Sequence, residues 1–200
     1  MLRPIFRGLL AVCAGGAGVI LAVGCEDPPP PTPAGAFALT LQDSPAADCN
    51  LSTHDSSMGL VGKSGEPDLI SDGAKGAVVT CSVKANAKKF DISADLENNG
   101  PILQITVNGI STSNDSAANA IEGFASYVST DTGGDLYSSP ACKFWIEPND
   151  AQYAKAGEAW LSFSCDAVTN AAATCKIING FVALKKCDGA VNEDCSGGGG

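Results

Sequence analysis

The chain has 200 residues, of which 44% are hydrophobic, and it carries 22 acidic residues against 12 basic ones. Both arginines, Arg3 and Arg7, lie near the start, so the rest of the chain has ten lysines and no arginine. Such an acidic surface repels phosphate backbones, and no stretch combines lysines with aromatic residues, so we expect no nucleic-acid partner.

The first 24 residues have the pattern of an export signal. A charged start is followed by the uncharged, mostly apolar stretch 8–24. Residues 22–25, Ala-Val-Gly-Cys, resemble the lipobox at which bacterial lipoproteins are acylated on cysteine and cleaved before it. We therefore expect a signal peptide over 1–24 and a lipid on Cys25 that attaches the chain to a bacterial membrane. Two alternatives stay open: cleavage at the same bond without lipid, and retention of the apolar stretch as a transmembrane helix.

Residues 25–36 follow the predicted cleavage site and contain five prolines. Proline favours an extended polyproline conformation that rises about 3.1 Å per residue. We interpret this segment as a stalk between the lipidated cysteine and a single domain over 37–195, and residues 196–200 as a glycine tail. The length of the chain leaves room for one ordinary domain.

From Phe37 onward the dominant hydrophobic period is two, which is typical of half-buried strands. Three such stretches, 76–84, 90–97 and 103–108, predict an antiparallel meander, and the Asn-Asn-Gly-Pro sequence at 98–101 predicts its second turn. Weaker strand patterns cover 37–41, 124–129 and 143–147.

The last third of the chain continues the alternation over 159–166. Stretches 175–178 and 181–184 flank Asn179-Gly180, which predicts a two-residue hairpin. Short helices are predicted over 116–122 and 151–156. The whole pattern predicts an all-β fold: an antiparallel β-sandwich or open barrel of about seven or eight short strands, stabilised by disulfides, with one or two short helices.

Nine cysteines are present, seven of them in the predicted domain. None forms a C-x-x-C pair and there is one histidine, so the spacing does not predict a metal site. In an exported chain we expect disulfides. Cys81 and Cys165 share their strand faces with apolar residues, so both should point inward, and we predict a bridge between them. Further disulfide candidates without a predicted partner are Cys49, Cys142, Cys175 and Cys187, while Cys195 is the expected odd thiol.

Two cysteine-containing stretches of this predicted β lipoprotein, 76–81 (GAVVTC) and 161–165 (LSFSC), resemble the mycobacterial nineteen-kilodalton lipoprotein antigen family. In that family a short VVC-type strand pairs with a terminal strand that ends in cysteine. The resemblance covers about residues 76–165. It implies a lipid-anchored envelope domain that binds a hydrophobic ligand or acts in adhesion, and it implies no catalytic residue.

Motifs with catalytic or metal chemistry are incomplete. Residues 60–64 (LVGKS) are similar to a phosphate-binding loop, but Ser57 replaces the first glycine. His54 is followed by Asp55 and Ser56, but adjacent residues cannot form a triad. Residues 131–135 (DTGGD) could offer oxygens to calcium, although a hairpin turn explains them better. Five aromatic residues could line a sugar-binding face or belong to the core: Tyr127, Tyr137, Trp145, Tyr153 and Trp160.

The sequence therefore predicts a non-enzymatic envelope lipoprotein, without cofactor or metal, whose β-domain binds or displays something at an outer membrane or cell surface rather than at an inner membrane. A second hypothesis is a small-ligand or carbohydrate-binding lipoprotein. A third is a secreted hydrolase built around His54. The sequence does not identify a protein or glycan partner.

Overall fold

The computed structural model describes residues 30–43, 49–147 and 151–188. The predicted leader, the lipidation site Cys25 and Cys195 lie outside the described residues. Within them, no helix is both long and apolar enough to cross a membrane.

The described residues contain eleven strands, which all belong to one antiparallel sheet. The order in the sheet is β2-β1-β11-β10-β8-β7-β6-β5-β4, while β3 pairs with β1 and β9 pairs with β10. The prediction of an antiparallel all-β fold is therefore confirmed, but the predicted number of strands was too low. The strands are β1 (Ala34–Gln42), β2 (His54–Met58), β3 (Ile70–Ser71), β4 (Ala77–Asn86), β5 (Lys89–Asn98), β6 (Ile102–Ile110), β7 (Ile121–Val128), β8 (Tyr137–Trp145), β9 (Tyr153–Lys155), β10 (Glu158–Thr169) and β11 (Thr174–Lys185).

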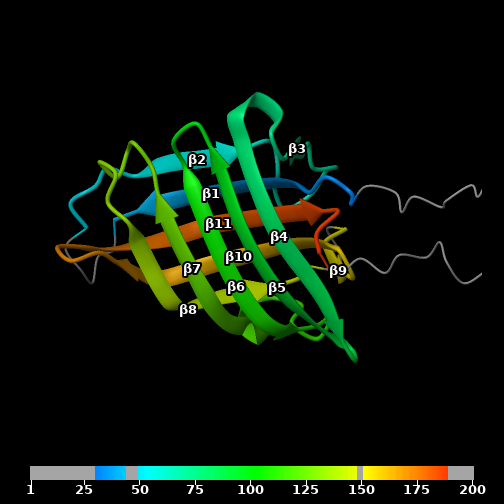
Figure 1. The fold of residues 1–200 in the computed structure, drawn as a ribbon. Coiled ribbons are helices and arrows are strands. Elements are labelled where there is room, and N and C mark those ends of the chain that lie inside the picture. Colours follow the sequence, from blue (N-terminus) through cyan, green and yellow to red (C-terminus); the bar gives the residue numbers. More distant parts are fainter. Residues whose placement is uncertain (1–29, 44–48, 148–150, 189–200) are drawn as a thin grey trace, which may run out of the picture. The chain divides into compact units, whose positions relative to one another are not determined.

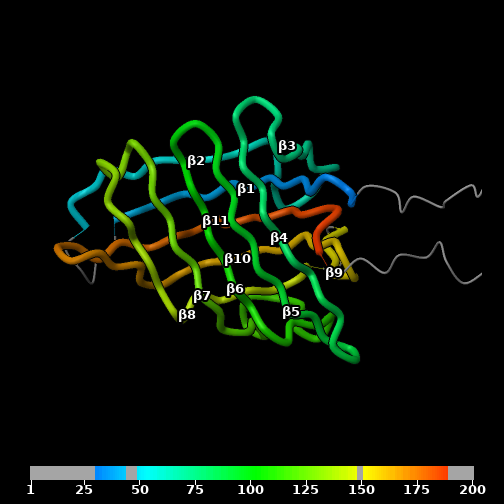
Figure 2. The backbone as a smooth tube through the Cα atoms, in the orientation of Figure 1, coloured from blue at the N-terminus to red at the C-terminus, as the bar shows by residue number. Residues whose placement is uncertain are grey.

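The sheet curls on itself into a half-barrel with two layers. In Figure 1, β4 to β8 run diagonally across β2, β1, β11 and β10. The backbone tube shows the same crossing without the ribbon width (Figure 2). Alternate residues of both layers point into the space between them and form one apolar core that includes Phe37, Val83, Leu96 and Phe163, each 2% exposed or less.

The meander predicted over 76–108 is confirmed. Strands β4 and β5 pair along their whole length, from Ala77 opposite Asn98 to Asn86 opposite Lys89. At the next turn the Asn98 N–H donates to the Pro101 carbonyl at 3.1 Å, and Asn99 has a φ of 50°. Asparagine tolerates this left-handed conformation, and for that reason the turn could be predicted from the sequence.

The hairpin predicted at Asn179-Gly180 is wrong, because both residues lie inside the continuous strand β11. Between Ile178 and Phe181, β11 has one residue more than β1, and the same extra residue appears opposite β10. Asn179 has a φ of 49°, so the pair forms a β-bulge. The actual hairpin turn precedes β11, where the Asn170 Oδ1 accepts from the Ala172 and Ala173 N–H groups at 2.8 and 2.7 Å.

The two predicted helices do not form. A single 3₁₀ turn, Ala117–Asn119, replaces the first, and β7 begins at Ile121. In place of the second, β9 folds back on β10 through a turn at Gly157, which has a φ of 77°. Strand β1 also begins at Ala34, so it includes the last residues of the predicted stalk over 25–36.

The two layers join where β8 pairs with β10. Phe144 lies opposite Phe163, and their rings stack with centroids 5.5 Å apart. Each ring lies over a glycine of the next strand: a Cβ on Gly123 would come within 3.0 Å of Phe144, and one on Gly180 within 2.7 Å of Phe163. Both glycines are required for this close approach.

Six cysteines form three disulfides: Cys49–Cys175, Cys81–Cys187 and Cys142–Cys165. Cys81 and Cys165 are both buried, but the predicted bridge between them is absent because each has another partner. The strand pairing implied by the family resemblance is absent too, since β4 and β10 are not neighbours in the sheet. Strand-face alternation shows that a cysteine points inward, but it does not show which inward cysteine lies opposite.

Candidate functional site

A shallow groove of about 340 Å³ crosses the outer face of β4, β5, β6 and β7, which we call the outer groove. It lies on the opposite side of the sheet from the core. Seven of its eleven lining residues are polar, and one is aromatic. The lining residues are Thr80, Cys81, Ser82, Ser93, Ala94, Asp95, Gln104, Ile105, Thr106, Phe124 and Asp188.

The strand register aligns the polar side chains of the groove in two rows across the sheet. One row contains Thr80, Asp95 and Gln104, which lie opposite one another in successive strands. The other contains Ser82, Ser93, Thr106 and Phe124. Because side chains alternate between the faces of a strand, the same residues that place the core inward place these rows outward.

Part of the first row is already hydrogen-bonded. The Gln104 Nε2 donates to the Asp95 Oδ2 at 3.0 Å, and the Ser126 Oγ donates to the Gln104 Oε1 at 3.2 Å. These bonds fix the orientation of the amide and of the carboxylate. The hydroxyls of Thr80, Ser82, Ser93 and Thr106 make no hydrogen bond to any described residue, so they are available to a ligand.

The groove has a wall at each end. At the β4 end, Asp188 donates its N–H to the Cys81 carbonyl at 3.0 Å and accepts from the Val83 N–H at 2.8 Å. The adjoining Cys81–Cys187 disulfide holds this segment beside β4. At the other end stands Phe124, which is 38% exposed. Few large apolar residues of the domain are this exposed, and Phe124 borders the groove.

The groove can form hydrogen bonds and offer one aromatic face. Two carboxylates, Asp95 and Asp188, are the charged groups among its lining residues. They disfavour an anionic ligand and accept hydrogen bonds from hydroxyl groups. The Phe124 ring offers an apolar face to the C–H groups of a sugar or similar ring. The lining contains no histidine and no lysine.

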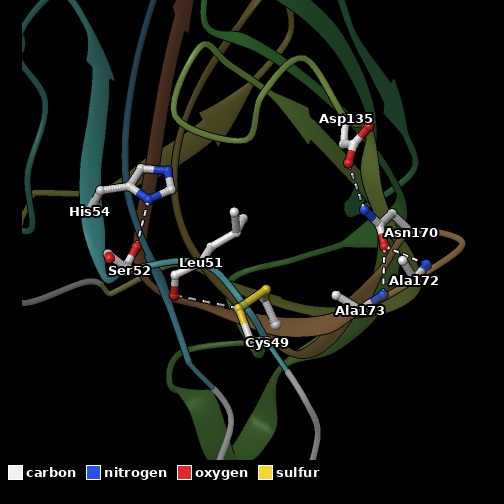
Figure 3. The surroundings of a disulfide bond; sticks show 9 residues. Cys49, Leu51, Ser52, His54, Asp135, Asn170, Ala172 and Ala173 are labelled. Carbon is white, nitrogen blue, oxygen red and sulfur yellow. Dashed lines mark hydrogen bonds between the residues drawn. A yellow bond between two sulfur atoms is a disulfide. The ribbon is translucent and has the colours of Figure 1, made fainter.

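His54 lies at the end of the domain that also carries the Cys49–Cys175 disulfide (Figure 3). Its Nδ1 lies 2.9 Å from the Ser52 carbonyl, and its buried Nε2 has no hydrogen-bond partner. Its ring centroid lies 6.4 Å from that of Tyr127. Asp55 instead accepts a hydrogen bond from Thr40. Among the described residues, His54 therefore has neither the serine nor the carboxylate partner that a triad requires.

The loop over 131–135, considered above for calcium, is a hydrogen-bonded turn between β7 and β8. The Gly134 N–H donates to the Ser129 carbonyl at 3.0 Å, and Thr132 is buried. Asp135 accepts from the Asn170 Nδ2 at 3.2 Å (Figure 3). The described part of the chain contains no group of three or more acidic, histidine or cysteine residues placed to hold a metal ion.

The stretch over 60–64, which is similar to a phosphate-binding loop, covers the outer side of the layer that contains β10 and β11. The Trp160 Nε1 donates to the Gly62 carbonyl at 3.1 Å, and Lys63 forms an ion pair with Glu147 at 2.6 Å. The loop thereby closes a small apolar cluster around Trp160 and Ala183. These contacts assign the stretch a structural position in the fold.

The aromatic candidates are mostly internal. Tyr127, Tyr137 and Trp160 are 4% exposed or less, and burial raises the pKa of both tyrosines. Tyr153 is half-buried and donates its hydroxyl to Glu158 at 2.9 Å; burial and this carboxylate raise its pKa to about 12. Tyr153 and Trp160 border a second pocket of about 350 Å³, together with Glu66 and Lys185. The aromatic residues do not form an exposed row.

Sequence reasoning did not find the outer groove, although a signal was present. The polar faces of 76–84, 90–97 and 103–108 could have been placed side by side once the meander was predicted. Alignment through the 98–101 turn would have set Asp95 beside Gln104. Phe124 stands out only when β7 is placed next to β6, because its outward position depends on that register.

The chain matches no protein-family model, no curated protein and no solved structure.

Proposed function

We propose that the chain is a lipid-anchored, extracytoplasmic protein whose β-domain binds a carbohydrate in the outer groove. The observation that carries the proposal is a set of hydroxyls with no hydrogen bond to any described residue, placed with an oriented amide and carboxylate beside an exposed aromatic ring. Sugars present both hydroxyl groups and C–H faces, so they match both parts of the lining. The two carboxylates in the lining favour neutral over acidic glycans.

Two observations support this location. Three disulfides are consistent with an extracytoplasmic domain, since thiols stay reduced in most cytosolic compartments. The anchor rests on the lipobox-like residues that end at Cys25. Cys25→Ser should abolish incorporation of labelled fatty acid and move the protein to the soluble fraction. Membrane retention of this variant, with no lipid on the wild type, would show that the apolar leader itself spans the membrane.

Glycan binding is tested with the full chain on an array of neutral and acidic oligosaccharides, followed by calorimetric titration of the best soluble binder. Neutral glycans should bind and acidic ones should not. Phe124→Ala should weaken binding by up to about tenfold, since an aromatic contact contributes about 0.5 to 1.5 kcal/mol. Gln104→Ala should also weaken it by removing an oriented polar partner.

Leu136→Ala is the matched control, because Leu136 is 55% exposed and does not line the groove. It should leave glycan affinity unchanged. Equal affinity of wild type, Phe124→Ala and Gln104→Ala for the bound glycan would exclude the groove as the binding site. No binding across the array would leave a display domain without a carbohydrate ligand.

A further inference from the structure

Polar side chains line the inner face of the sheet near His54. Leu39 and Leu41 of β1 point into the core, and Ser56 and His54 lie directly opposite them on β2. Residues opposite one another in neighbouring strands share a face of the sheet, so both polar side chains point inward. Tyr127 on β7 approaches from the other layer. It is 0% exposed, and its ring centroid lies 6.4 Å from that of His54.

Two buried side-chain atoms at this end of the core have no hydrogen-bond partner among the described residues. They are the Nε2 of His54 and the hydroxyl oxygen of Tyr127. Burial raises the pKa of Tyr127, and the nearby hydroxyls of Ser129 and Ser56 act in the opposite direction, but neither reaches hydrogen-bonding geometry. The Ser129 Oγ instead accepts from two backbone N–H groups of its own turn. Because an unpaired buried polar group is costly, both atoms indicate a bound partner from outside the chain.

The contact at Nδ1 decides what the Nε2 of His54 can bind. Nδ1 lies 2.9 Å from the Ser52 carbonyl oxygen, which can only accept a hydrogen bond. The ring therefore carries its proton on Nδ1, and in the neutral imidazole Nε2 is then an acceptor. Figure 3 shows this contact, with the ring pointing from β2 toward the interior of the fold. The partner of Nε2 must donate a hydrogen bond.

These requirements define the chemical class of the bound molecule. A carboxylate or another group that only accepts does not satisfy Nε2. A metal ion needs several ligands, and the described residues include no group of three or more acidic, histidine or cysteine residues placed to hold one. The molecule must also be small, because Leu39, Leu41 and Tyr127 are each 2% exposed or less. Water is small, and it both donates and accepts hydrogen bonds.

We infer that this end of the core binds one water molecule, which donates to the His54 Nε2 and accepts from the Tyr127 hydroxyl. Immobilising a water costs less free energy than leaving two buried polar groups unpaired. The water joins β2 to β7 in the other layer, whereas among the described strands β2 pairs only with β1. The inference depends neither on glycan binding nor on the lipid anchor.

The chain has a single histidine, so its imidazole can be observed without overlap. The test uses the full chain without a histidine tag, labelled with ¹⁵N and studied by NMR at alkaline pH, where histidine is neutral. Nδ1 should carry the proton, and the ring should show a nuclear Overhauser effect to a slowly exchanging water. Tyr127→Phe should shift the Nε2 resonance and abolish the water signal.

Tyr137→Phe is the matched control. Tyr137 lies opposite Tyr127 on β8 and is equally buried, but its hydroxyl is not one of the two unpartnered atoms. This variant should keep both the Nε2 resonance and the water signal. An equal water signal in wild type and Tyr127→Phe would overturn the inference. A scalar coupling between the Tyr127 hydroxyl proton and Nε2 would also overturn it, because it would show a direct bond in place of the water.

Unfolding equilibria provide a second measurement. Tyr127→Phe and His54→Leu should each raise the equilibrium constant of unfolding about tenfold, because each removes one partner of the water and leaves the other unpaired. The double variant should raise it by no more than about tenfold, since both changes disrupt the same water. Independent effects that multiply to about a hundredfold would show that the two atoms do not share a water, and would overturn the inference.

Discussion

The meander β4 to β8 and the layer β2, β1, β11 and β10 build one sheet in different ways. Each strand from β4 to β7 pairs with the strand that follows it in the chain, whereas the other layer combines β1 and β2 from the start with β10 and β11 from the end. None of the three disulfides joins two successive meander strands. Short connections close at little entropic cost, so the covalent bonds lie where the chain joins distant segments.

Removing those disulfides should have the largest effect on the free energy of unfolding. Cys81→Ala with Cys187→Ala opens a loop of 106 residues, and the free energy of unfolding should fall by up to about 5 kcal/mol. Cys142→Ala with Cys165→Ala opens 23 residues and should cost about 3.5 kcal/mol. Denaturant unfolding measures both values.

Hydrogen exchange locates the effect of the first pair. The Val83 amide, which donates to Asp188, should exchange faster without the disulfide, and glycan affinity should fall because the wall of the outer groove is released. Amides that join β5 to β6 should keep their protection. Uniform loss of protection across the meander would show that its local pairing is not sufficient for its stability.

A smaller perturbation acts where the two layers join. Gly180→Ala would place a Cβ 2.6 Å from the Phe163 carbonyl oxygen, and the resulting shift should destabilise the protein by about 1 to 3 kcal/mol. Gly123→Ala should act similarly from the meander side, because its Cβ would meet the Thr106 carbonyl at 2.6 Å.

Gly62→Ala is the control for both glycine variants. Its Cβ would meet nothing closer than 3.9 Å, and its φ is not in the left-handed region, so unfolding should be nearly unchanged. If Gly180→Ala unfolds like Gly62→Ala, the Phe144–Phe163 stack tolerates displacement and does not fix how the layers join.

The smallest effect concerns the tyrosines, two in the meander and one on β9. Each has a raised pKa, and that of Tyr153 is about 12. Since the neutral phenol is favoured in the folded state, this contribution to stability is complete below pH 10 and is lost as pH rises through about 12. Tyrosinate absorbance at 295 nm should therefore lag behind that of the unfolded chain. Tyr153→Phe should remove the latest part of the rise, and an unchanged curve would contradict the Glu158 contact.

The same contrast explains which parts of the fold were predictable. The meander and its 98–101 turn could be predicted because hydrophobic alternation and turn residues are local signals. Asn179-Gly180 was misread because a left-handed asparagine suits a hairpin turn and a bulge alike, and only the pairing of β11 with β1 and β10 decides between them. The disulfide partners also depend on contacts between distant segments.

The candidate site follows the same division. The hydrophobic alternation in the sequence showed that the side chains of Thr80, Asp95 and Gln104 face away from the core. Their alignment into rows needed the strand register, and the groove needed Asp188, which reaches β4 from beyond the end of β11. Candidates chosen by residue type, such as His54 and the buried tyrosines, lay elsewhere because residue type does not define a face of the sheet.

The segments along the outer edge of β4 have a consequence for solubility. An open strand edge can add a strand from another molecule and start aggregation. Here Ala77 accepts from the Gly73 N–H, Val79 donates to the Asp72 carboxylate, and Asp188 and Gly157 bond to Cys81 and Val83. A second copy of the chain therefore meets a β4 edge along which each of these four positions already has a partner within its own chain.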